Sequence, residues 1–269
     1  MGVVIRGQVE DVPGVLVRSW LDRSLLRLNM GEDGRPRYTR WVRSIVLHTT
    51  KGIPGGRDQR PQQILPGRGN DAQGDIRVAL SWARSSRQAG AHLVVDHDGS
   101  AACLADLADE VSYHSGEVNE VSIGIEIYQG SDAELYEGQL ESVVALVDYL
   151  TRRFHIQRQY QWPYHRRPAA RIASGAQDVV GIFGHRDVTT NRGLGDPGDA
   201  IFERLASAGY EAVDFATSQD LETWKLRQQE LNRDLNAGLR VDGVPGPSTT
   251  AAIERSGRGH GLWVSRPGD

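Results

Sequence analysis

The sequence predicts an α/β fold, with a central mixed β-sheet flanked by helices and a small helical domain at the C-terminal end. Strand-like apolar runs alternate with segments of helical period between residues 42 and 208. Beyond residue 212 the strand-like runs stop, and an amphipathic segment is followed by a Gly/Pro turn and a second short helical segment. The 269 residues, 39% apolar and 25% charged, are enough for one sizeable core and a small second unit.

The first part of the chain contains short β-rich runs and a long loop. GVVIR and GVLVRSWL flank the turn signal DVPG, and WVRSIVLHTT is typical of a strand that ends near His48. Residues 51–74 are rich in Gly, Pro, Gln and Arg, which predicts a long loop. A helix is expected from Asp75 to Gly90.

The middle of the chain continues the alternation. AHLVVDHDGSAACLA is typical of a hairpin with HDGS as its turn, and the alternating isoleucines of VSIGIEIYQG predict another strand. Residues 131–154 predict a helix, with Ser131 and Glu134 at the spacing of a capping box. The apolar run VVGIFG predicts a strand that ends at His185, and a helix is expected at about 199–208.

These patterns divide the chain into four parts. We expect a β-rich N-terminal extension at residues 1–40 and a main α/β domain at 41–212. FATSQD marks a linker at 213–220, and a helical tail follows at 221–269.

Composition and charge exclude several classes of protein. The net charge of −4 provides no overall field that would attract nucleic acid. The single cysteine, Cys103, lies in an apolar run and allows neither an intrachain disulfide nor a thiolate-rich zinc site. Charged residues interrupt the N-terminal segment before any signal peptide could form, and no apolar window is long enough to span a membrane. We therefore expect synthesis in the cytoplasm without a signal peptide.

Histidines lie beside the predicted strands, where sites of α/β proteins are usually built. His48 and His185 end two strands, and Asp196 returns on a tight turn before Pro197. Two imidazoles and a carboxylate leave one position free on Zn²⁺, which is the pattern of a catalytic site. The alternatives are strand-end histidines satisfied by hydrogen bonds, and an aspartate that caps a helix.

Several motifs, taken in order over residues 41–208, resemble one family. They are SIVLHTT, AHLVVDHDGS, VSYHSG, VSIGIEIYQG and GHRDVTTNRGLGDPGDAIF. The chain resembles the zinc-dependent N-acetylmuramoyl-L-alanine amidases of type 2, which are related to phage endolysins and to peptidoglycan recognition proteins. In the tail, VDGVPGPST after a helix resembles a peptidoglycan-binding domain of the three-helix type.

The resemblance implies a role for each candidate residue. It implies that His48, His185 and Asp196 bind Zn²⁺. It implies that Glu126, in IGIE, is the general base. The alternative is that Glu126 simply lies on a solvent-exposed face of its strand. It implies further that His114 lines the cleft, as a candidate for contact with the substrate or the developing oxyanion.

Two further residues near the expected site have less definite roles. His92 is either substrate-facing or structural, and Asn119 is a candidate substrate-binding residue.

Two features depart from the family pattern. Many relatives place a lysine two residues before the third ligand, where this chain has Leu194, so that Arg192 is the nearest cation and a candidate oxyanion donor beside His114. The second is an insert at 154–175 that combines arginines with aromatic residues. It is either a basic rim for the carboxylates of stem peptides or a surface excursion packed by its own aromatics.

The expected function is hydrolysis of the amide bond between N-acetylmuramic acid and L-alanine in peptidoglycan. A wall-anchoring tail suits a phage-type endolysin that is released through a lysis pore and acts on the cell wall. The alternatives are a non-catalytic peptidoglycan-recognition protein and a cytoplasmic amidase that recycles muropeptides.

Overall fold

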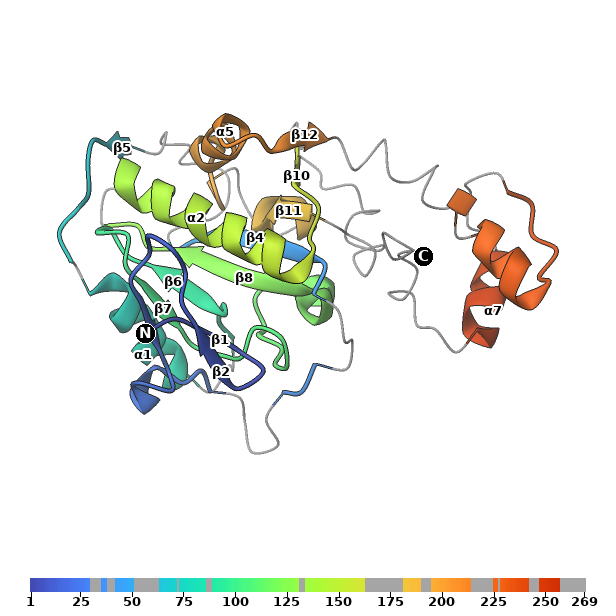
Figure 1. Cartoon of the computed structure of the whole chain (residues 1–269), viewed down its shortest axis with the longest axis horizontal. Coiled ribbons are helices and arrows are strands. Elements are labelled where there is room, and N and C mark those ends of the chain that lie inside the picture. The colour runs from blue at the N-terminus through green and yellow to red at the C-terminus, as the bar shows by residue number, and fades with distance from the viewer. Residues whose placement is uncertain are drawn as a thin grey trace.

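The computed structural model contains a central mixed β-sheet covered by helices on both faces (Figure 1). It describes residues 1–29, 35–37, 42–50, 63–71, 73–85, 89–130, 134–162, 181–189, 195–213, 225–226, 228–241 and 247–256. Within these residues the sheet has eight strands in the order β12-β10-β11-β4-β8-β6-β7-β3. All neighbouring pairs are parallel except β6 and β7, so the prediction of a mixed sheet flanked by helices is confirmed.

The strands of this sheet are short except for the two at its centre. The bounds are β3 Val17–Ser19, β4 Ser44–Thr49, β6 Leu93–Val95, β7 Ala101–Cys103, β8 Ser122–Ile127, β10 Gln159–Gln161, β11 Gly181–Gly184 and β12 Glu211–Val213. Strands β4 and β8 have six residues each and are buried almost throughout, as expected for parallel strands covered on both faces.

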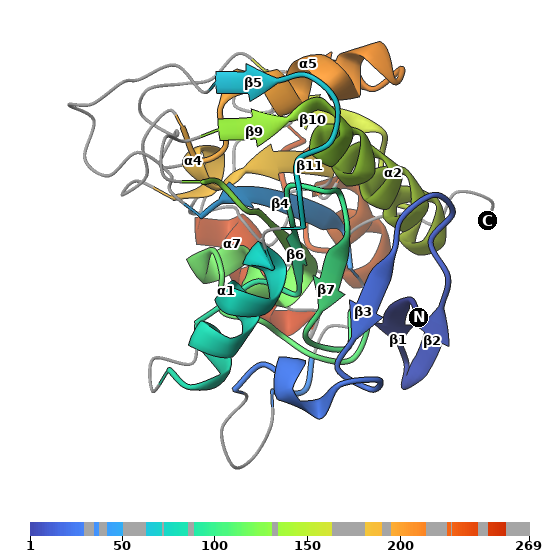
Figure 2. The same cartoon turned by 90° about the vertical axis from the view of Figure 1, so that its left-hand side faces the viewer.

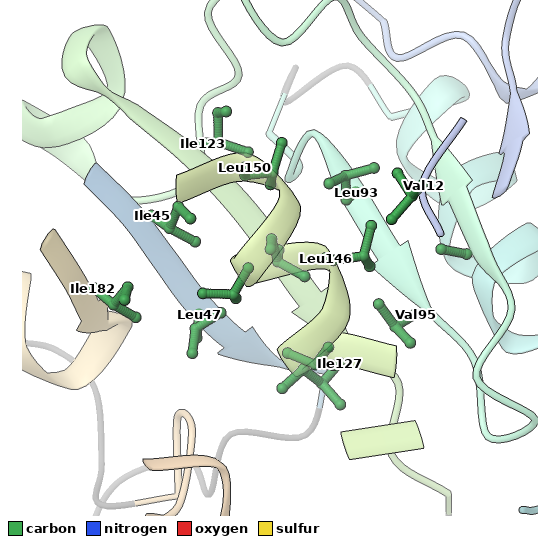
Figure 3. Packing of buried hydrophobic residues seen from close by; sticks show 14 of the residues in the cluster. Val12, Ile45, Leu47, Leu93, Val95, Ile123, Ile127, Leu146, Leu150 and Ile182 are labelled. Atoms are coloured by element: carbon green, nitrogen blue, oxygen red, sulfur yellow. The ribbon is translucent and has the colours of Figure 1, made fainter. Parts of the chain in front are cut away.

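One face of the sheet packs against a long amphipathic helix. Helix α2 (Glu137–Phe154) carries an apolar stripe at helical period, and α5 (Asp199–Ser207) packs beside it. Figure 3 shows Leu146 and Leu150 of α2 against Ile45 and Ile123 of the central strands. This is the main core of the molecule.

The other face of the sheet packs against shorter elements. Helix α1 (Gly74–Ala83) buries Ala79 against Val94 and Ala102, on the side opposite to α2 (Figures 1 and 2). The 3₁₀ helices η1 (Ser24–Leu26) and η3 (Gly116–Val121) and the single turn α4 (His185–Val188) also pack on this side. Successive strand residues thus face different layers, because side chains alternate along a strand.

The N-terminal segment shares the main core. Strands β1 (Val3–Ile5) and β2 (Gln8–Glu10) form an antiparallel hairpin beside β3, which is the edge strand next to β7 (Figure 2). The side chains of β1 are buried in the same cluster as those of the central strands. Tyr149 and Arg153 of α2 donate hydrogen bonds of 2.6 and 2.8 Å to the Glu10 carboxylate. These contacts make the extension part of the main fold.

Two helix ends differ from the predictions. Helix α1 ends at Ala83 rather than at Gly90, and α2 begins at Glu137 rather than at residue 131. Glu134 lies in β9 (Glu134–Tyr136), which pairs with β5 (Gln63–Leu65), and its expected capping partner Ser131 lies outside the described residues. Instead the backbone N–H of Tyr136 donates to Gln139 Oε1 at 3.2 Å, one turn into the helix. Tertiary pairing has therefore displaced the start of the helix.

The C-terminal part contains helical residues and a small apolar cluster. Residues 225–226 and 228–235 are helical, and α7 covers Pro247–Arg255. Leu231, Leu239 and Ala252 are buried together, and the Asn232 side chain bonds both the N–H and the carbonyl of Leu239. A separate peptidoglycan-binding domain, with the expected linker at 213–220, stays a prediction. In the described part of the chain, no helix has both the length and the apolar character to cross a membrane.

Candidate metal centre

The candidate site lies at the carboxyl ends of three adjacent central strands. Strand β4 lies between β11 and β8, and the cross-strand partner of His48 is Glu126. Paired residues of parallel neighbours point to the same face, so both side chains lie on the face opposite to α2. His185 follows directly after β11 and opens α4. Strand order thus brings together residues that are far apart in the sequence.

His48, His185 and Asp196 form a buried group. His48 Nδ1 lies 2.9 Å from His185 Nδ1, and His185 Nδ1 lies 3.1 Å from Asp196 Oδ2. The three ligand atoms lie within 4.8 Å of one another, and the residues are only 3–4% exposed. The structure therefore brings the three predicted metal ligands together.

Asp196 does not cap a helix. Helix α5 has Gly198 at its N-cap position without a side-chain hydrogen bond, and it begins three residues after Asp196. The Asp196 carboxylate instead accepts a hydrogen bond from the Thr49 backbone N–H at Oδ1, at 3.0 Å, and faces His185 with Oδ2. This backbone contact ties the returning loop to the end of β4.

The chemistry of the three side chains fits a divalent cation. Two imidazole nitrogens and a carboxylate oxygen at these distances all offer lone pairs, which repel one another unless a proton or a cation lies between them. Nitrogen and carboxylate ligands suit Zn²⁺, and three protein ligands are the usual number in catalytic zinc sites. The residues present therefore fit the expected metal.

Glu126 lies in the same cleft as the metal group. The cleft has a volume of about 250 Å³, and Glu126, His48, His185 and Asp196 form part of its lining. Trp82, residues 89–91 and Tyr113 also line this cleft. Glu126 therefore faces the cleft and not bulk solvent alone, which makes it available to a substrate bound beside the metal group.

His114 also lines the cleft, and both of its ring nitrogens lie within hydrogen-bonding distance of protein atoms. Nδ1 lies 3.0 Å from His48 Nε2, and Nε2 lies 3.1 Å from Ser122 Oγ. Burial, more than any neighbouring charge, holds the pKa of His114 well below its usual range. Contact with an oxyanion, the predicted role, would require one of these hydrogen bonds to break.

His92 lies next to His114, with their ring centroids 5.6 Å apart, and is fully buried. Its Nδ1 accepts a hydrogen bond from the Gly124 N–H at 3.0 Å, which leaves Nε2–H to donate to the Glu110 carbonyl at 3.2 Å. Burial and the charge of Arg37 lower the pKa of His92 to about 3, so the ring is neutral. Of the two predicted roles, the structural one is favoured by this geometry.

Asn119 holds the backbone next to His114. Its Oδ1 accepts hydrogen bonds from the N–H groups of His114 and Ser115, at 3.1 and 2.7 Å. These contacts position the loop that carries His114, and the expected role of Asn119 in substrate binding stays a prediction. Arg192 and Leu194 lie outside the described residues.

Two residues near His114, Arg37 and Ser122, were not among the candidates predicted from the sequence. Arg37 donates hydrogen bonds to the carbonyls of Glu110, Asn119 and Ser122, and so ties together the backbone around His114. Ser122 and Gly124 precede Glu126 on the same face of β8, and the period of two residues was the available signal for them. In the insert, Arg158 pairs with Asp148 of α2, while Arg166, Arg167 and Arg171 lie outside the described residues.

A mixed sheet with two buried histidines, an aspartate and a neighbouring glutamate is an arrangement suited to a metal-dependent hydrolase. Residues 37–199 match the N-acetylmuramoyl-L-alanine amidase family (Amidase_2), and this match covers more than half of the 269 residues. The chain belongs to this family. All eight candidate site residues lie within the matched segment.

The chain is also similar to several solved structures. The endolysin amidase LysCS of Clostridium intestinale has 18% identity and a TM-score of 0.41, over 74% of this chain and 97% of that one. The Ph2119 endolysin, from a Thermus scotoductus bacteriophage, has 17% identity and a TM-score of 0.39, over 72% and 99%. A mutant of the Drosophila recognition protein PGRP-LB, in complex with tracheal cytotoxin, has 15% identity and a TM-score of 0.44, over 73% and 96%. No curated protein sequence matches the chain at the required significance.

Proposed function

We propose that the protein is a zinc-dependent N-acetylmuramoyl-L-alanine amidase that hydrolyses peptidoglycan. The observation that carries this proposal is the convergence of His48, His185 and Asp196 in a cleft that also contains Glu126. Membership of the amidase family supports the choice of bond, the amide between N-acetylmuramic acid and L-alanine.

The two histidines and the aspartate would hold the metal. Zn²⁺ bound there supplies Lewis acidity, which polarises the scissile carbonyl and lowers the pKa of a water molecule. Asp196 is kept in place by the Thr49 N–H, and Thr49 Oγ1 donates to the Gly195 carbonyl at 2.6 Å. These contacts hold the carboxylate toward the histidines before any ligand arrives.

Glu126 is the proposed general base. Its carboxylate takes a proton from the attacking water and returns it to the amine nitrogen of L-alanine as the amide bond breaks. Its position opposite His48 on the neighbouring strand supports this role. Arg192 remains the proposed oxyanion donor, because the ring nitrogens of His114 already contact other protein atoms.

We further propose that the enzyme is a phage-type endolysin that acts on the bacterial cell wall. The tail at 221–269 would bind the wall polymer, and the main domain would cut the bond between glycan and stem peptide. The peptidoglycan-binding pattern VDGVPGPST supports this division of labour.

Digestion of purified sacculi by the full chain tests the proposal. We expect zinc-dependent release of intact stem peptides with new L-alanine amino groups, identified by mass spectrometry. Glu126→Gln should keep its zinc and lose about 10²–10⁴-fold in rate, whereas the control Glu137→Gln, at the start of α2, should remain active.

Two outcomes would contradict parts of this proposal. Normal turnover by Glu126→Gln would remove that residue from the role of base. A zinc-loaded chain that binds several peptidoglycan types but releases no peptide from any of them would be a recognition protein rather than an amidase.

A further inference from the structure

A chain of hydrogen bonds leads from a backbone carbonyl to the candidate ligand His48. Ser122 Oγ donates to the Val118 carbonyl at 2.7 Å and lies 3.1 Å from His114 Nε2. On the other side of the same ring, His114 Nδ1 lies 3.0 Å from His48 Nε2. His48 Nδ1 then faces His185.

The Val118 carbonyl sets the direction of each hydrogen bond in this series. A carbonyl oxygen can only accept, so the single hydroxyl proton of Ser122 points at Val118. Ser122 Oγ must then accept from His114, which places the proton of that ring on Nε2 and leaves Nδ1 as an acceptor. His48 in turn donates from Nε2 to His114 Nδ1, because a neutral imidazole carries one proton. The Ser115 hydroxyl, 2.9 Å from His114 Nδ1, can rotate to donate to the same nitrogen.

The consequence lies at the other nitrogen of His48. With the proton on Nε2, the lone pair of Nδ1 is directed at His185 and Asp196, where a cation would be bound. The partner of the second ring nitrogen commonly fixes the tautomer and the orientation of a ligating histidine. Here that partner is another imidazole, whose own tautomer is set by a buried serine.

The hydrogen bonds that link Val118, Ser122, His114 and His48, called the relay below, have little freedom to rearrange. Ser122 and Val118 are fully buried, so water does not compete for the hydroxyl group. A Cβ on Gly124 would lie 2.7 Å from Cγ and Nδ1 of His114, so the ring rests directly on the backbone of β8. Asn119 fixes the backbone of His114 from the other side.

We propose that Ser122 is a positioning residue that acts through His114 to fix the tautomer of His48, and so strengthens zinc binding. This inference rests on the proposed function, since it concerns the affinity of the same metal group. Ser122 touches neither the metal ligand nor the cleft directly; its effect passes through one imidazole ring.

The direct test is the tautomer of each ring in the unaltered, metal-free chain. Long-range ¹H–¹⁵N correlation spectra at pH 8 should show both His48 and His114 protonated at Nε2. A His114 ring protonated at Nδ1 would overturn the proposal, whatever any variant does.

The second test is the zinc affinity of Ser122→Ala, measured by competition with a chelator. We expect a Kd about 10–100-fold higher than that of the unaltered chain, and a mixture of His48 tautomers in the metal-free spectrum. Ser44→Ala is the matched control, because Ser44 is the buried cross-strand partner of Ser122 and its hydroxyl bonds only the Val121 carbonyl among the contacts seen. It should leave the zinc Kd unchanged.

The outcomes separate this proposal from the proposed function. If the unaltered chain binds zinc and Ser122→Ala, with a native thermal transition, binds it equally well, the relay is refuted and the zinc amidase is not. If the unaltered chain binds no zinc, the proposed function fails, and the effect of Ser122 on metal affinity fails with it.

Discussion

Gly124→Ala should disturb both the stability of the fold and the metal site. The added Cβ would lie 2.7 Å from Cγ and Nδ1 of His114 and 3.0 Å from Cδ2. Ordinary contacts begin at 3.4 Å, so either the imidazole or strand β8 has to move. The ring cannot retreat freely, because its two nitrogens lie 3.0 and 3.1 Å from His48 Nε2 and Ser122 Oγ.

The size of the effect follows from three contributions. Overpacking a tight interior typically costs about 1–3 kcal/mol. Weakening one buried hydrogen bond adds about 1 kcal/mol. Replacing glycine by alanine within a strand offsets about 0.5–1 kcal/mol of this through chain entropy. We therefore expect a net loss of about 1–3.5 kcal/mol in the free energy of unfolding, and about 2–4 °C in Tm for each kcal/mol in a chain of this size.

A double-mutant cycle with His114→Ala tests the cause of this loss. Thermal or urea unfolding of the metal-free chain gives the free energy of unfolding of each variant. If the alanine methyl clashes with the imidazole, Gly124→Ala should cost much less in the His114→Ala background, with a coupling of at least about 1 kcal/mol. Additive costs, or a Gly124→Ala variant with unchanged Tm and zinc affinity, would refute the reasoning.

Three further predictions concern other parts of the chain. Cys103 is fully buried and burial raises the pKa of its thiol to about 12, so a thiol reagent at pH 8 should label only the unfolded chain; rapid labelling of the native protein would contradict this. Burial also raises the pKa of Asp75 from 3.8 to about 6. The free energy of unfolding should therefore fall as the pH rises from 4 to 6, because the buried carboxyl loses its proton less readily than it does in the unfolded chain. The urea midpoint of Asp75→Asn should change less over this range than that of the unaltered chain. Equal slopes for both proteins would show that Asp75 is not the source. Deletion of residues 221–269 should reduce co-sedimentation with sacculi while leaving hydrolysis of a soluble muropeptide intact; loss of that hydrolysis would contradict the two-domain division.

The sequence predicted the central strands well because their patterns are local. The isoleucines at 123, 125 and 127 alternate with Ser122, Gly124 and Glu126, and this period identified β8 without any tertiary information. The three metal ligands are a different case, because His48 and His185 are 137 residues apart. Family motifs, rather than spacing, placed them together, and the strand order β11-β4-β8 explains how the fold brings them into contact.

Features that depend on pairing between distant segments were not predictable. Strand β9 pairs with β5, which lies about seventy residues earlier in the chain, and this pairing moved the start of α2. The N-terminal strand β3 pairs with β7 at the edge of the main sheet, although nothing in its sequence predicts this pairing. The hydrogen bonds of His114 depend on the orientation of a ring, which no spacing rule specifies.

The alternation along β8 explains why the site and the core depend on each other. The odd-numbered isoleucines pack under α2, while the even-numbered residues supply a serine hydroxyl, room for an imidazole and a carboxylate on the opposite face. A slip of one residue in the pairing of β8 with β4 would move all of these side chains to the wrong face at once. The apolar contacts with α2 therefore hold the register that places Glu126 beside His48, so the precision of the proposed chemistry derives from the packing of the opposite face.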